Sequence, residues 1–574
     1  MAEISEKNKM IIEKIKKLRS SFKKLDIDGY VIPKNDEFFS EYSREDKLKF
    51  ISNFSGSAGY AIILKNKNYL FVDGRYTIQA QKESGKNFKV VKLEKIINCK
   101  LFKNKVLGVD PKVFTSNQIK KFFVKNNRTK TISDTMTNKF FNYHQFSPKP
   151  FFSLNEKFTG ENHKKKINRL VAWLKKVKSN YIFISAPENI AWLLNIRGHD
   201  NPNSPIPNCR LLVNDLGKVF LISKKTTANK LVSERKLTNN QIIDPSNFQK
   251  FLNKLKNGKV VIDKKSCSLF YEKIIEEKFN IIKEEDPIYH FKSIKNTVEI
   301  DGMIKSHLLD GVALTKFLYW IKKINKKNIT EFQAQKKLES FRKLNKNYLY
   351  PSFDTIAGAG GNGAIVHYRA NRVNSKKINK NDIFLCDSGG QYKYGTTDVT
   401  RTICFKKPSK NIRNIFTRVL KGHIAVVTSN LKTHYNGKLI DIRARKYLKE
   451  SNLNYDHGTG HGVGFYLNVH EGPQAISKFN AVKICEGMIL SNEPGYYKKG
   501  KFGIRIENLI FVSKIKKKLQ FENLTLAPIE KDLINYDLLN DYEKDYLFRY
   551  HLEVYTKLSR FLNLKEKKWL MSFI

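Results

Sequence analysis

The chain has 574 residues, 41% of them hydrophobic and 12% aromatic, which suits about two to four domains and excludes a wholly disordered chain. With 106 Lys and Arg against 54 Asp and Glu, its net charge of +52 raises the question of nucleic acid or an anionic membrane surface. However, the lysines are spread over every segment, and Lys, Asn, Ile, Phe and Tyr are abundant together, as AT-rich codons would produce. We therefore expect no dedicated nucleic-acid surface.

The N-terminal segment predicts an amphipathic helix and not a targeting sequence. Ile11, Ile12, Ile15 and Leu18 follow helical spacing, and the charged residues among them exclude the apolar core of a signal peptide or membrane span. The six cysteines form no CxxC pair, so neither a zinc knuckle nor a disulfide framework is indicated. We expect a soluble protein, without a membrane partner, that stays in the cytoplasm.

Two stretches in the first half of the chain are typical of small mixed α/β domains. The apolar runs AIIL at 61–64 and YLFV at 69–72 flank the polar turn KNKN, which predicts a pair of strands. A similar alternation of strand runs and helical stretches returns between residues 180 and 263. We place one domain over residues 1–155 and a second over 156–288.

From Ser293 the sequence changes character. Residues 304, 308, 312, 315 and 318 lie on one face of a predicted long helix, and glycine-rich loops with short strands continue to about residue 515. These features predict a third domain over 289–515. The tail, 516–574, is again helical in its period, and its aromatic residues suit a dimer contact.

The stretch DIFLCDSGGQYKYGTTDVTRTICF places two aspartates in a predicted β-hairpin. With the turn centred between Tyr392 and Lys393, Asp387 pairs with Asp398, and their Cβ atoms lie about 5 Å apart. Two carboxylates this close repel each other unless one is protonated or cations lie between them. For an isolated hairpin, two solvated turn aspartates are the simpler interpretation.

Two glutamates follow further along the chain. Glu493 stands at a strand end before a Pro-Gly turn, in MILSNEPGYY. In FGIRIENLIFV, Arg505 and Glu507 point to one face of a strand, and the isoleucines beside them point to the other. An acid on the inner face of an apolar strand needs a partner, and Arg505 alone could serve as one.

Three histidines, at positions 457, 461 and 470, lie in HGTGHGVGFYLNVHEGP. His457 and His461 have the spacing of one helical face, but each glycine around them opposes a helix by about 1 kcal/mol. The HE pair at His470 does not begin an HExxH zinc motif, because a glutamine replaces the second histidine and a proline interrupts the helix. The residues alone leave open which histidine, if any, binds a metal.

Taken together, these motifs resemble those of the pita-bread metallopeptidases, the group of methionine aminopeptidases, prolidases and aminopeptidase P. HGTGHGVGFYLNVHEGP, EPGYY, GIRIEN, VDGRY, FSGSAG and IAWLLNIRG are similar to motifs of the long, three-domain Xaa-Pro aminopeptidases, from about residue 25 to the tail. The resemblance implies an α/β (α+β) fold, with a pita-bread (creatinase/aminopeptidase) catalytic domain over 289–515. Two smaller creatinase-N-like domains precede it, and 516–574 extends it.

The resemblance also implies a five-ligand metal site. Four carboxylates and one imidazole carry four negative charges, which two divalent ions neutralise, and hard oxygen ligands favour Mn²⁺ or Co²⁺ over structural zinc. Manganese is the metal usual in the family. In the family pattern, two carboxylates bridge both ions, one holds the first ion, and the histidine with a glutamate holds the second. These ligands are, in that order, Asp398 and Glu507, then Asp387, then His461 with Glu493.

The remaining roles also follow from the resemblance. His367, His457 and His470 surround the bound peptide, where imidazoles can donate hydrogen bonds and shuttle protons near neutral pH. A hydroxide bridging two metals attacks the peptide carbonyl, so no Ser or Cys nucleophile is needed. Glu493 passes the proton to the leaving nitrogen, and Arg505 positions Glu507 or the substrate. The expected enzyme is a homodimer that removes the N-terminal residue from peptides with proline in second position.

Other readings of the sequence differ in testable ways. A prolidase, which cuts only dipeptides, resembles chains with one N-terminal domain and not two. A methionine aminopeptidase would lack most of the first 290 residues, and creatinase relatives lack the metals. A silent pita-bread protein that binds nucleic acid would suit the basic charge, but such relatives lose ligands that are all present here. Steep salt dependence of nucleic-acid affinity would identify this last class.

Overall fold

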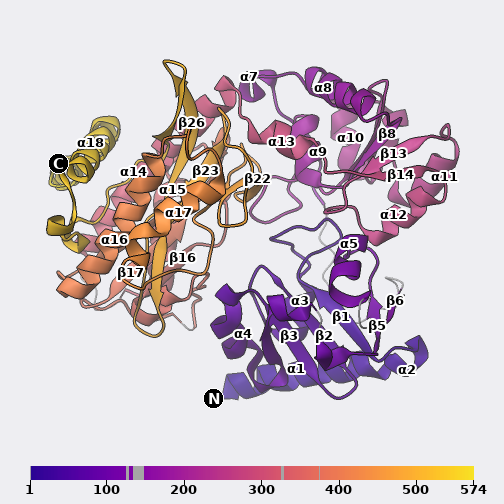
Figure 1. Ribbon diagram of the computed structural model, residues 1–574, viewed down its shortest axis with the longest axis horizontal. Coiled ribbons are helices and arrows are strands. Elements are labelled where there is room, and N and C mark those ends of the chain that lie inside the picture. The colour runs from indigo at the N-terminus through magenta and orange to yellow at the C-terminus, as the bar shows by residue number, and fades with distance from the viewer. Residues whose placement is uncertain (1, 98, 125–127, 133–147, 325–328, 374) are drawn as a thin grey trace. The chain divides into compact units, whose positions relative to one another are not determined.

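The computed structural model of the protein describes residues 2–97, 99–124, 128–132, 148–324, 329–373 and 375–574 (Figure 1). The chain divides into two compact units, Met1–Glu156 with Glu161–Ile288, and Lys157–Gly160 with Tyr289–Ile574. Within the described ranges, no helix combines the length and apolar character needed to cross a membrane.

The first unit contains a six-stranded sheet in the order β4-β3-β2-β1-β5-β6. The two apolar runs predicted as strands form β2 and β3, which pair antiparallel. The central strand β1 pairs antiparallel with β2 and parallel with β5. The strands are β1 (Gly29–Pro33), β2 (Gly59–Leu64), β3 (Asn68–Val72), β4 (Lys89–Lys92), β5 (Val106–Val109) and β6 (Arg128–Thr131).

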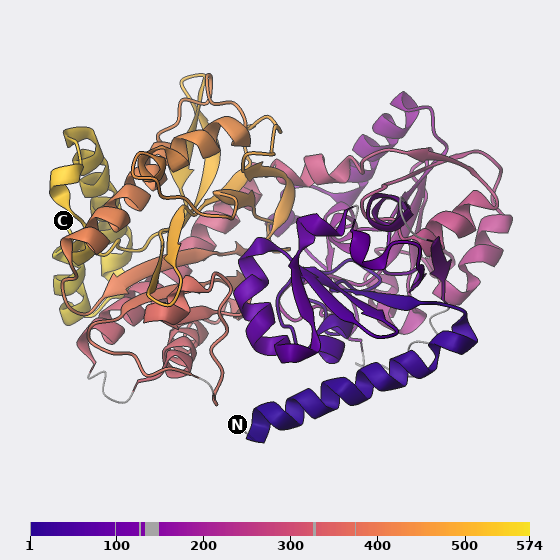
Figure 2. The ribbon, with the colours of Figure 1, turned by 60° about the horizontal axis from the view of Figure 1, so that its bottom comes forward.

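Helix α1 (Ala2–Ser20) runs along this sheet (Figure 2). Ile11, Ile15 and Leu18 are buried in one apolar cluster with sheet residues such as Ile63. Ile12, which the sequence placed on the same face, is 43% exposed. A helix turns by about 100° per residue, so Ile11 and Ile12 cannot both face the sheet fully.

A second six-stranded sheet, β12-β11-β10-β8-β13-β14, repeats the first one in order and pairing. Its central strand β8 pairs antiparallel with β10 and parallel with β13, as β1 does with β2 and β5. The strands are β8 (Tyr181–Ile184), β10 (Arg210–Asn214), β11 (Val219–Ile222), β12 (Ile242–Ile243), β13 (Lys259–Ile262) and β14 (Asn280–Lys283). The helices of this part are α8 (His163–Lys176), α9 (Pro187–Leu193), α10 (Lys225–Ser233), α11 (Phe248–Asn253) and α12 (Leu269–Glu276).

The second unit begins with the predicted long helix, α14 (Thr297–Lys323). Asn296 caps it through a reciprocal pair of hydrogen bonds with Glu299. The predicted apolar face is confirmed in its second half, where Thr315 and Leu318 are buried, and wrong at its start, where Ile304 is 41% exposed. His307 and Asp310, outside that face, are also buried. Asp310 is buried because it forms an ion pair inside the protein, which its polarity does not reveal in sequence.

Four sheets and four further helices complete the described core of this unit. Apolar residues of α14 and α15 (Glu331–Lys343) pack on β16 (Ile356–Ala359), β17 (Ile383–Ser388) and β20 (Val399–Cys404). Apolar residues of α16 (Lys410–Val427) and α17 (Gly437–Lys449) pack on β22 (Glu471–Ile476), β23 (Ile489–Asn492) and β26 (Asn508–Ile515). The sheets are β15-β18-β19, β16-β17-β20, β22-β21-β23-β26-β27 and β24-β25, together with the pair β7-β9 of the first unit. Their strands are β7 (Phe152–Ser153), β9 (Ile196–Arg197), β15 (Tyr348–Pro351), β16 (Ile356–Ala359), β17 (Ile383–Ser388), β18 (Gly390–Tyr392), β19 (Gly395–Thr396), β20 (Val399–Cys404), β21 (Gly460–Gly462), β22 (Glu471–Ile476), β23 (Ile489–Asn492), β24 (Gly495–Lys498), β25 (Phe502–Arg505), β26 (Asn508–Ile515) and β27 (Lys518–Asn523). The helices are α13 (Ile288–Ser293), α15 (Glu331–Lys343), α16 (Lys410–Val427) and α17 (Gly437–Lys449).

From Tyr536 onward the C-terminal tail is helical, as predicted, and forms α18 (Asp541–Leu558) and α19 (Leu564–Met571). Its aromatic residues divide between two environments. Tyr542 is 62% exposed and Phe548 is 47% exposed, whereas Tyr550 is buried. One side of α18 therefore belongs to the core of the second unit.

Candidate metal centre

Two neighbouring strands bring the two aspartates to one face of a sheet. β17 carries Asp387, and Asp398 directly precedes β20. Asp387 pairs with Thr400, so the predicted pairing of Asp387 with Asp398 is wrong. Tyr392 pairs with Gly395, which centres the turn one residue later than predicted and displaces each partner by two residues. Since side chains alternate between faces, a displacement of two keeps both aspartates on the same face.

His461 and the two glutamates come from the ends of other strands. β21 carries His461 and lies beside β23, which Glu493 follows, while Glu507 lies between β25 and β26. Gly460 permits this close packing, because a Cβ there would lie 1.9 Å from the Ser491 carbonyl oxygen. The glycines that oppose a helix in this motif therefore let the His461 strand approach the strand that leads to Glu493.

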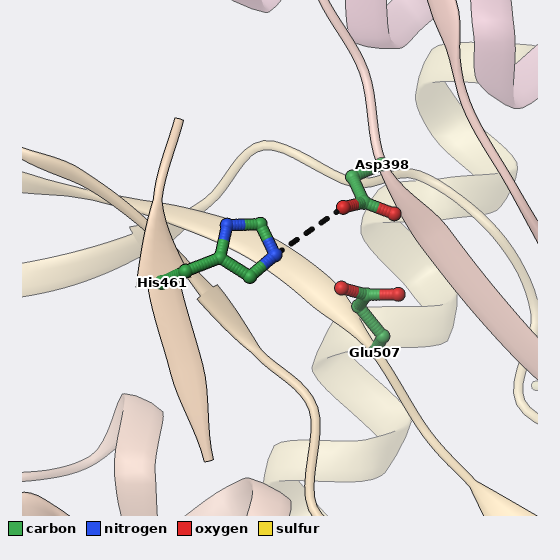
Figure 3. Close-up of side chains that lie close together, drawn as sticks. All are labelled: Asp398, His461 and Glu507. Carbon is green, nitrogen blue, oxygen red and sulfur yellow. Dashed lines mark ion pairs between the residues drawn. The ribbon is translucent and has the colours of Figure 1, made fainter. Parts of the chain in front are cut away.

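The candidate ligand atoms of Asp398, His461 and Glu507 all lie within 4.8 Å of one another (Figure 3). His461 Nε2 lies 3.5 Å from Asp398 Oδ2 and 3.6 Å from Glu493 Oε1. The other ring nitrogen of His461, Nδ1, donates to the Gly462 carbonyl oxygen at 2.9 Å. With Nδ1 held in this hydrogen bond, Nε2 is the nitrogen that faces the carboxylates, where a divalent cation would take the place of a proton.

Asp387 adds a fourth carboxylate that is only half satisfied. Arg505 Nη2 donates to Asp387 Oδ2 at 2.5 Å. The second oxygen, Oδ1, is buried and has no hydrogen-bond partner among the residues that the structure describes. Leaving a buried acceptor unpaired costs about 1–3 kcal/mol, and more for a charged group. A cation at Oδ1 would remove this cost.

The electrostatics of the cluster also favour bound cations. Burial, reinforced by Asp398 and Glu493 and opposed by Arg505, raises the pKa of Asp387 to about 6. Burial, with the charges of Asp398 and Asp387, raises the pKa of Glu507 well above its ordinary value. These carboxylates repel one another as anions, and divalent cations would remove that repulsion. Four carboxylates and one imidazole therefore fit two divalent ions.

A row of hydrogen bonds leads from Arg505 to His457. Arg505 Nη1 donates to the Tyr497 hydroxyl at 2.7 Å, and this hydroxyl lies 2.8 Å from His457 Nε2. His457 Nδ1 donates to the Gly458 carbonyl oxygen at 2.7 Å, so Nε2 accepts the Tyr497 proton. Arg445 of α17 donates to the His457 carbonyl oxygen at 2.6 Å and holds the loop in place. Both ring nitrogens of His457 are thus held in hydrogen bonds, which fix the position of the imidazole.

His470 lies directly against the predicted ligand histidine. Its ring contacts His461 edge to face, with the ring centroids 4.3 Å apart. The next residue, Glu471, is buried and forms ion pairs with Lys292 at 2.9 Å and Lys295 at 2.5 Å. This buried group fixes the start of β22 and hence the backbone at His470.

His367 is half-buried in the turn that follows the 3-10 helix Gly360–Ala364. Ile365 and Tyr368, on either side of it, pack in one apolar cluster with Leu385 of β17 and with Tyr497. The turn carrying His367 is therefore held beside the strand that ends at Asp387.

Two residues of the site were missed from the sequence. Tyr497 links Arg505 to His457, and Thr400 donates from Oγ1 to Glu507 Oε2 at 2.7 Å. Strand alternation in DVTRT could have found Thr400, because it lies on the same face as Asp398. The motif EPGYY drew attention to Tyr497 without a geometric reason to choose it, since its partners are distant in sequence.

Family profiles match most of the chain. The profile described as Metallopeptidase family M24 matches residues 301–514, and the C-terminal region of peptidase M24 matches 517–573. Two profiles of the Creatinase/Prolidase N-terminal domain match residues 14–135 and 144–299. These matches divide the chain into segments of the same kinds as the sequence predicts.

Individual relatives match over nearly the full length. A protein of Laccaria bicolor named probable Xaa-Pro aminopeptidase P is 36% identical, over 97% of this chain and 92% of its own. Xaa-Pro aminopeptidase 1 of Dictyostelium discoideum is 34% identical, over 98% and 96%. The solved X-prolyl aminopeptidase of Caenorhabditis elegans, described as a cytosolic enzyme with a di-nuclear active site, is 30% identical with a TM-score of 0.90, over 98% of this chain and 99% of that one.

Asp398, His461 and Glu507 thus lie together in a region that the M24 profile matches, and the relatives span nearly the whole chain. This chain belongs to the Xaa-Pro aminopeptidase P family of the M24 metallopeptidases.

Proposed function

We propose that the protein is a metal-dependent aminopeptidase that hydrolyses the bond between an N-terminal residue and a penultimate proline. The observation that carries this proposal is the convergence of Asp398, His461 and Glu507 beside Asp387, whose second carboxylate oxygen is buried and unpaired. The specificity for proline rests on the family. In this proposal, residues 1–155, 156–288 and 289–515 are domains, and 516–574 extends the catalytic one.

The residues present suit hydrolysis without a side-chain nucleophile. Two divalent cations, held by Asp387, Asp398, His461, Glu493 and Glu507, would supply Lewis-acid activation of water and of the scissile carbonyl. Although burial raises the pKa of Glu493, the charges of His461 and Arg505 help to lower it overall, so Glu493 is an anion at neutral pH and could take up the proton that a cation-activated water loses. It can then pass this proton to the leaving nitrogen.

The histidines around the cluster suit the bound peptide. Tyr497 donates to His457 Nε2, and Arg505 donates to Tyr497. This row of hydrogen bonds can therefore rearrange when His457 gains or loses a proton. His470 and His367 are both half-buried and keep contact with solvent, as groups that meet a substrate must. We assign these three histidines to hydrogen bonds with the peptide carbonyls and to proton transfer.

We further propose manganese as the native metal, a homodimer as the working form and the cytoplasm as its location. Hard oxygen ligands with a single nitrogen support manganese over a thiolate-bound zinc. The exposed aromatic residues of α18, Tyr542 and Phe548, support an interface. The C. elegans relative is described as cytosolic, which supports the location. Light scattering at micromolar concentration tests the dimer, because a particle of 66.8 kDa would contradict it.

The decisive experiment is hydrolysis of matched peptides by metal-stripped protein with and without added Mn²⁺. Arg-Pro-Pro, Arg-Ala-Ala and the dipeptide Ala-Pro are compared, and metal content is measured by mass spectrometry. We expect Mn²⁺ to restore release of the first residue from Arg-Pro-Pro alone, with two ions bound per chain. The His461→Gln variant serves as the control that keeps the fold and loses a ligand.

The other outcomes each identify a different protein. Cleavage confined to Ala-Pro would make it a prolidase-type dipeptidase. No metal-dependent cleavage of any peptide, together with salt-sensitive binding of nucleic acid, would make it a silent binding protein. Either result would overturn the proposed function.

A further inference from the structure

Arg401 is a buried cation on β20, between the two threonines that face the predicted ligands. Only 1% of its surface is exposed, and strand alternation directs its side chain away from the face that carries Thr400. No ion pair found among the described residues includes it, and its hydrogen-bond acceptors are all neutral oxygens. A buried guanidinium without a carboxylate partner is expensive, so a function for it must be sought.

One side of the guanidinium holds the backbone at Glu507. Nη1 donates to the Glu507 carbonyl oxygen at 2.7 Å and to the Thr400 carbonyl oxygen at 2.9 Å. Nη2 donates to the side-chain oxygen of Asn508, the residue after Glu507, at 2.8 Å. The same two chain segments also meet through the Glu507 N–H, which donates to the Thr400 carbonyl at 3.2 Å. Arg401 thus holds the backbone from which the Glu507 side chain extends into the site.

The other side of the guanidinium holds the C-terminal segment. Nε donates to the Pro528 carbonyl oxygen at 3.0 Å, and Nη2 donates to the Ala527 carbonyl oxygen at 2.8 Å and the Tyr550 hydroxyl at 2.9 Å. Tyr550 lies on α18, is 3% exposed, and also hydrogen-bonds the Ala527 carbonyl oxygen at 2.9 Å. These contacts connect the tail to Glu507 through one side chain.

We propose that Arg401 and Tyr550 are positioning residues, through which helix α18 fixes the backbone at Glu507 and so sets the affinity of the site for divalent cations. This inference rests on the proposed function only in taking Glu507 as a ligand. It gives the C-terminal segment a role inside its own chain that is separate from any dimer contact.

The chemistry of arginine suits this task. Its planar fork offers five N–H donors in fixed directions, so it can hold backbone oxygens from three chain segments at once, which the single ammonium of lysine cannot do. Its positive charge also lies behind Glu507, on the side of the ligand away from the other carboxylates. Groups that hold a metal ligand from behind typically change metal affinity or activity by about 10–100-fold when they are altered.

The test compares Tyr550→Phe and Arg401→Lys with the wild type. Affinity for Mn²⁺ is measured calorimetrically on metal-stripped full-length protein, with kcat and KM for Arg-Pro-Pro at saturating metal. We expect about tenfold weaker metal binding for Tyr550→Phe and about 100-fold for Arg401→Lys, with reduced kcat and unchanged KM. Tyr550→Phe keeps the buried ring, so the fold survives.

Tyr546→Phe is the matched control. Tyr546 lies one turn earlier on α18, stacks on Tyr550 and hydrogen-bonds Asn523, and its hydroxyl does not touch Arg401. We expect this variant to bind Mn²⁺ as the wild type does. The proposal is overturned if Tyr550→Phe loses thermal stability but keeps wild-type metal affinity and kcat, or if Tyr546→Phe weakens metal binding equally. A wild type that binds no metal would instead refute the proposed function.

Discussion

Arg505 and Asp387 form a buried ion pair, with 2.5 Å between Nη2 and Oδ2, while the second oxygen of Asp387 has no hydrogen-bond partner among the described residues. The arginine therefore compensates one side of the carboxylate and leaves the other open toward Asp398 and Glu493. Without Arg505, Asp387 would be harder to ionise, and a second donor at Oδ1 would compete with a cation for that oxygen.

Replacing Arg505 by methionine should destabilise the metal-free protein by about 3–5 kcal/mol, because it leaves Asp387 as a buried acid without its cation. Added Mn²⁺ should then raise the melting temperature by more than it does in the wild type, since the metal replaces the missing positive charge. Chemical denaturation and thermal melting with and without Mn²⁺ measure both effects.

Arg210→Met is the control for that prediction. It removes the arginine of another ion pair, that with Glu37, whose N–O distance is 3.1 Å and which belongs to the first unit. Its Mn²⁺-induced shift should equal that of the wild type. An Arg505→Met shift no larger than the wild-type shift would show that Arg505 does not share its role with the metal.

Metal binding should depend on pH through His461. Burial lowers the pKa of its imidazole, but Asp398 and Glu493 raise it to about 9, above the ordinary value of 6.5. The proton on His461 therefore stabilises the metal-free fold fully below pH 6.5, and this stability is lost as the pH rises through about 9. A cation must displace that proton, so apparent metal affinity should rise about tenfold per pH unit in this window.

Calorimetric titration in two buffers of different ionisation enthalpy counts the protons released. We expect metal binding at pH 7.5 to release about one proton fewer in the His461→Gln variant than in the wild type. Metal affinity that does not change between pH 6.5 and about 9 would contradict the assignment of His461 as a ligand.

Removing one hydroxyl should separate proton transfer from binding. In Tyr497→Phe, His457 loses the donor to Nε2 and Arg505 loses one acceptor. We expect kcat for Arg-Pro-Pro to fall about 100-fold, with KM nearly unchanged, because the hydroxyl acts on the imidazole and not on the peptide. Tyr496→Phe, whose ring packs on Phe502 in the same strand pair, should behave as the wild type. Equal losses in both variants would assign the effect to packing.

The buried group of Lys292, Lys295 and Glu471 allows a prediction from its unequal numbers of positive and negative charges. It holds two cations and one anion, all at most 2% exposed in their side chains. Glu471→Gln leaves two unpaired cations and should cost about 3–5 kcal/mol of stability, whereas Lys295→Met leaves a balanced pair and should cost less. Urea denaturation gives both values. A larger loss for Lys295→Met would mean that the third charge is satisfied in another way.

Local sequence patterns predicted strands and their buried faces well where the positions of apolar residues alone determine them. The runs at 61–64 and 69–72 form paired strands, as their apolar residues predict. Patterns failed where distant partners decide. Ile304, on the predicted apolar face of α14, is 41% exposed, whereas Asp310 is buried against Arg342, which is 32 residues away.

The turn of the Asp387 hairpin shows the same limit on a smaller scale. Its centre lies one residue later than its glycines suggest, because the pairs of β18 with β19 continue the ladder to Tyr392 and Gly395. The error did not move either aspartate to the other face, since a change of two residues preserves the side-chain direction. The candidate ligands were therefore found despite an incorrect register.

The sequence by itself determined the kinds of residues in the site, their order along the chain and the family, because these depend on local spacing and on motifs. Only the tertiary structure decided which atoms face each other: the free oxygen of Asp387, the hydroxyl of Tyr497 between His457 and Arg505, and the contact of Arg401 with both Glu507 and Tyr550. The physical reason is that these interactions join segments as much as 149 residues apart, where no local periodicity relates one side chain to the other.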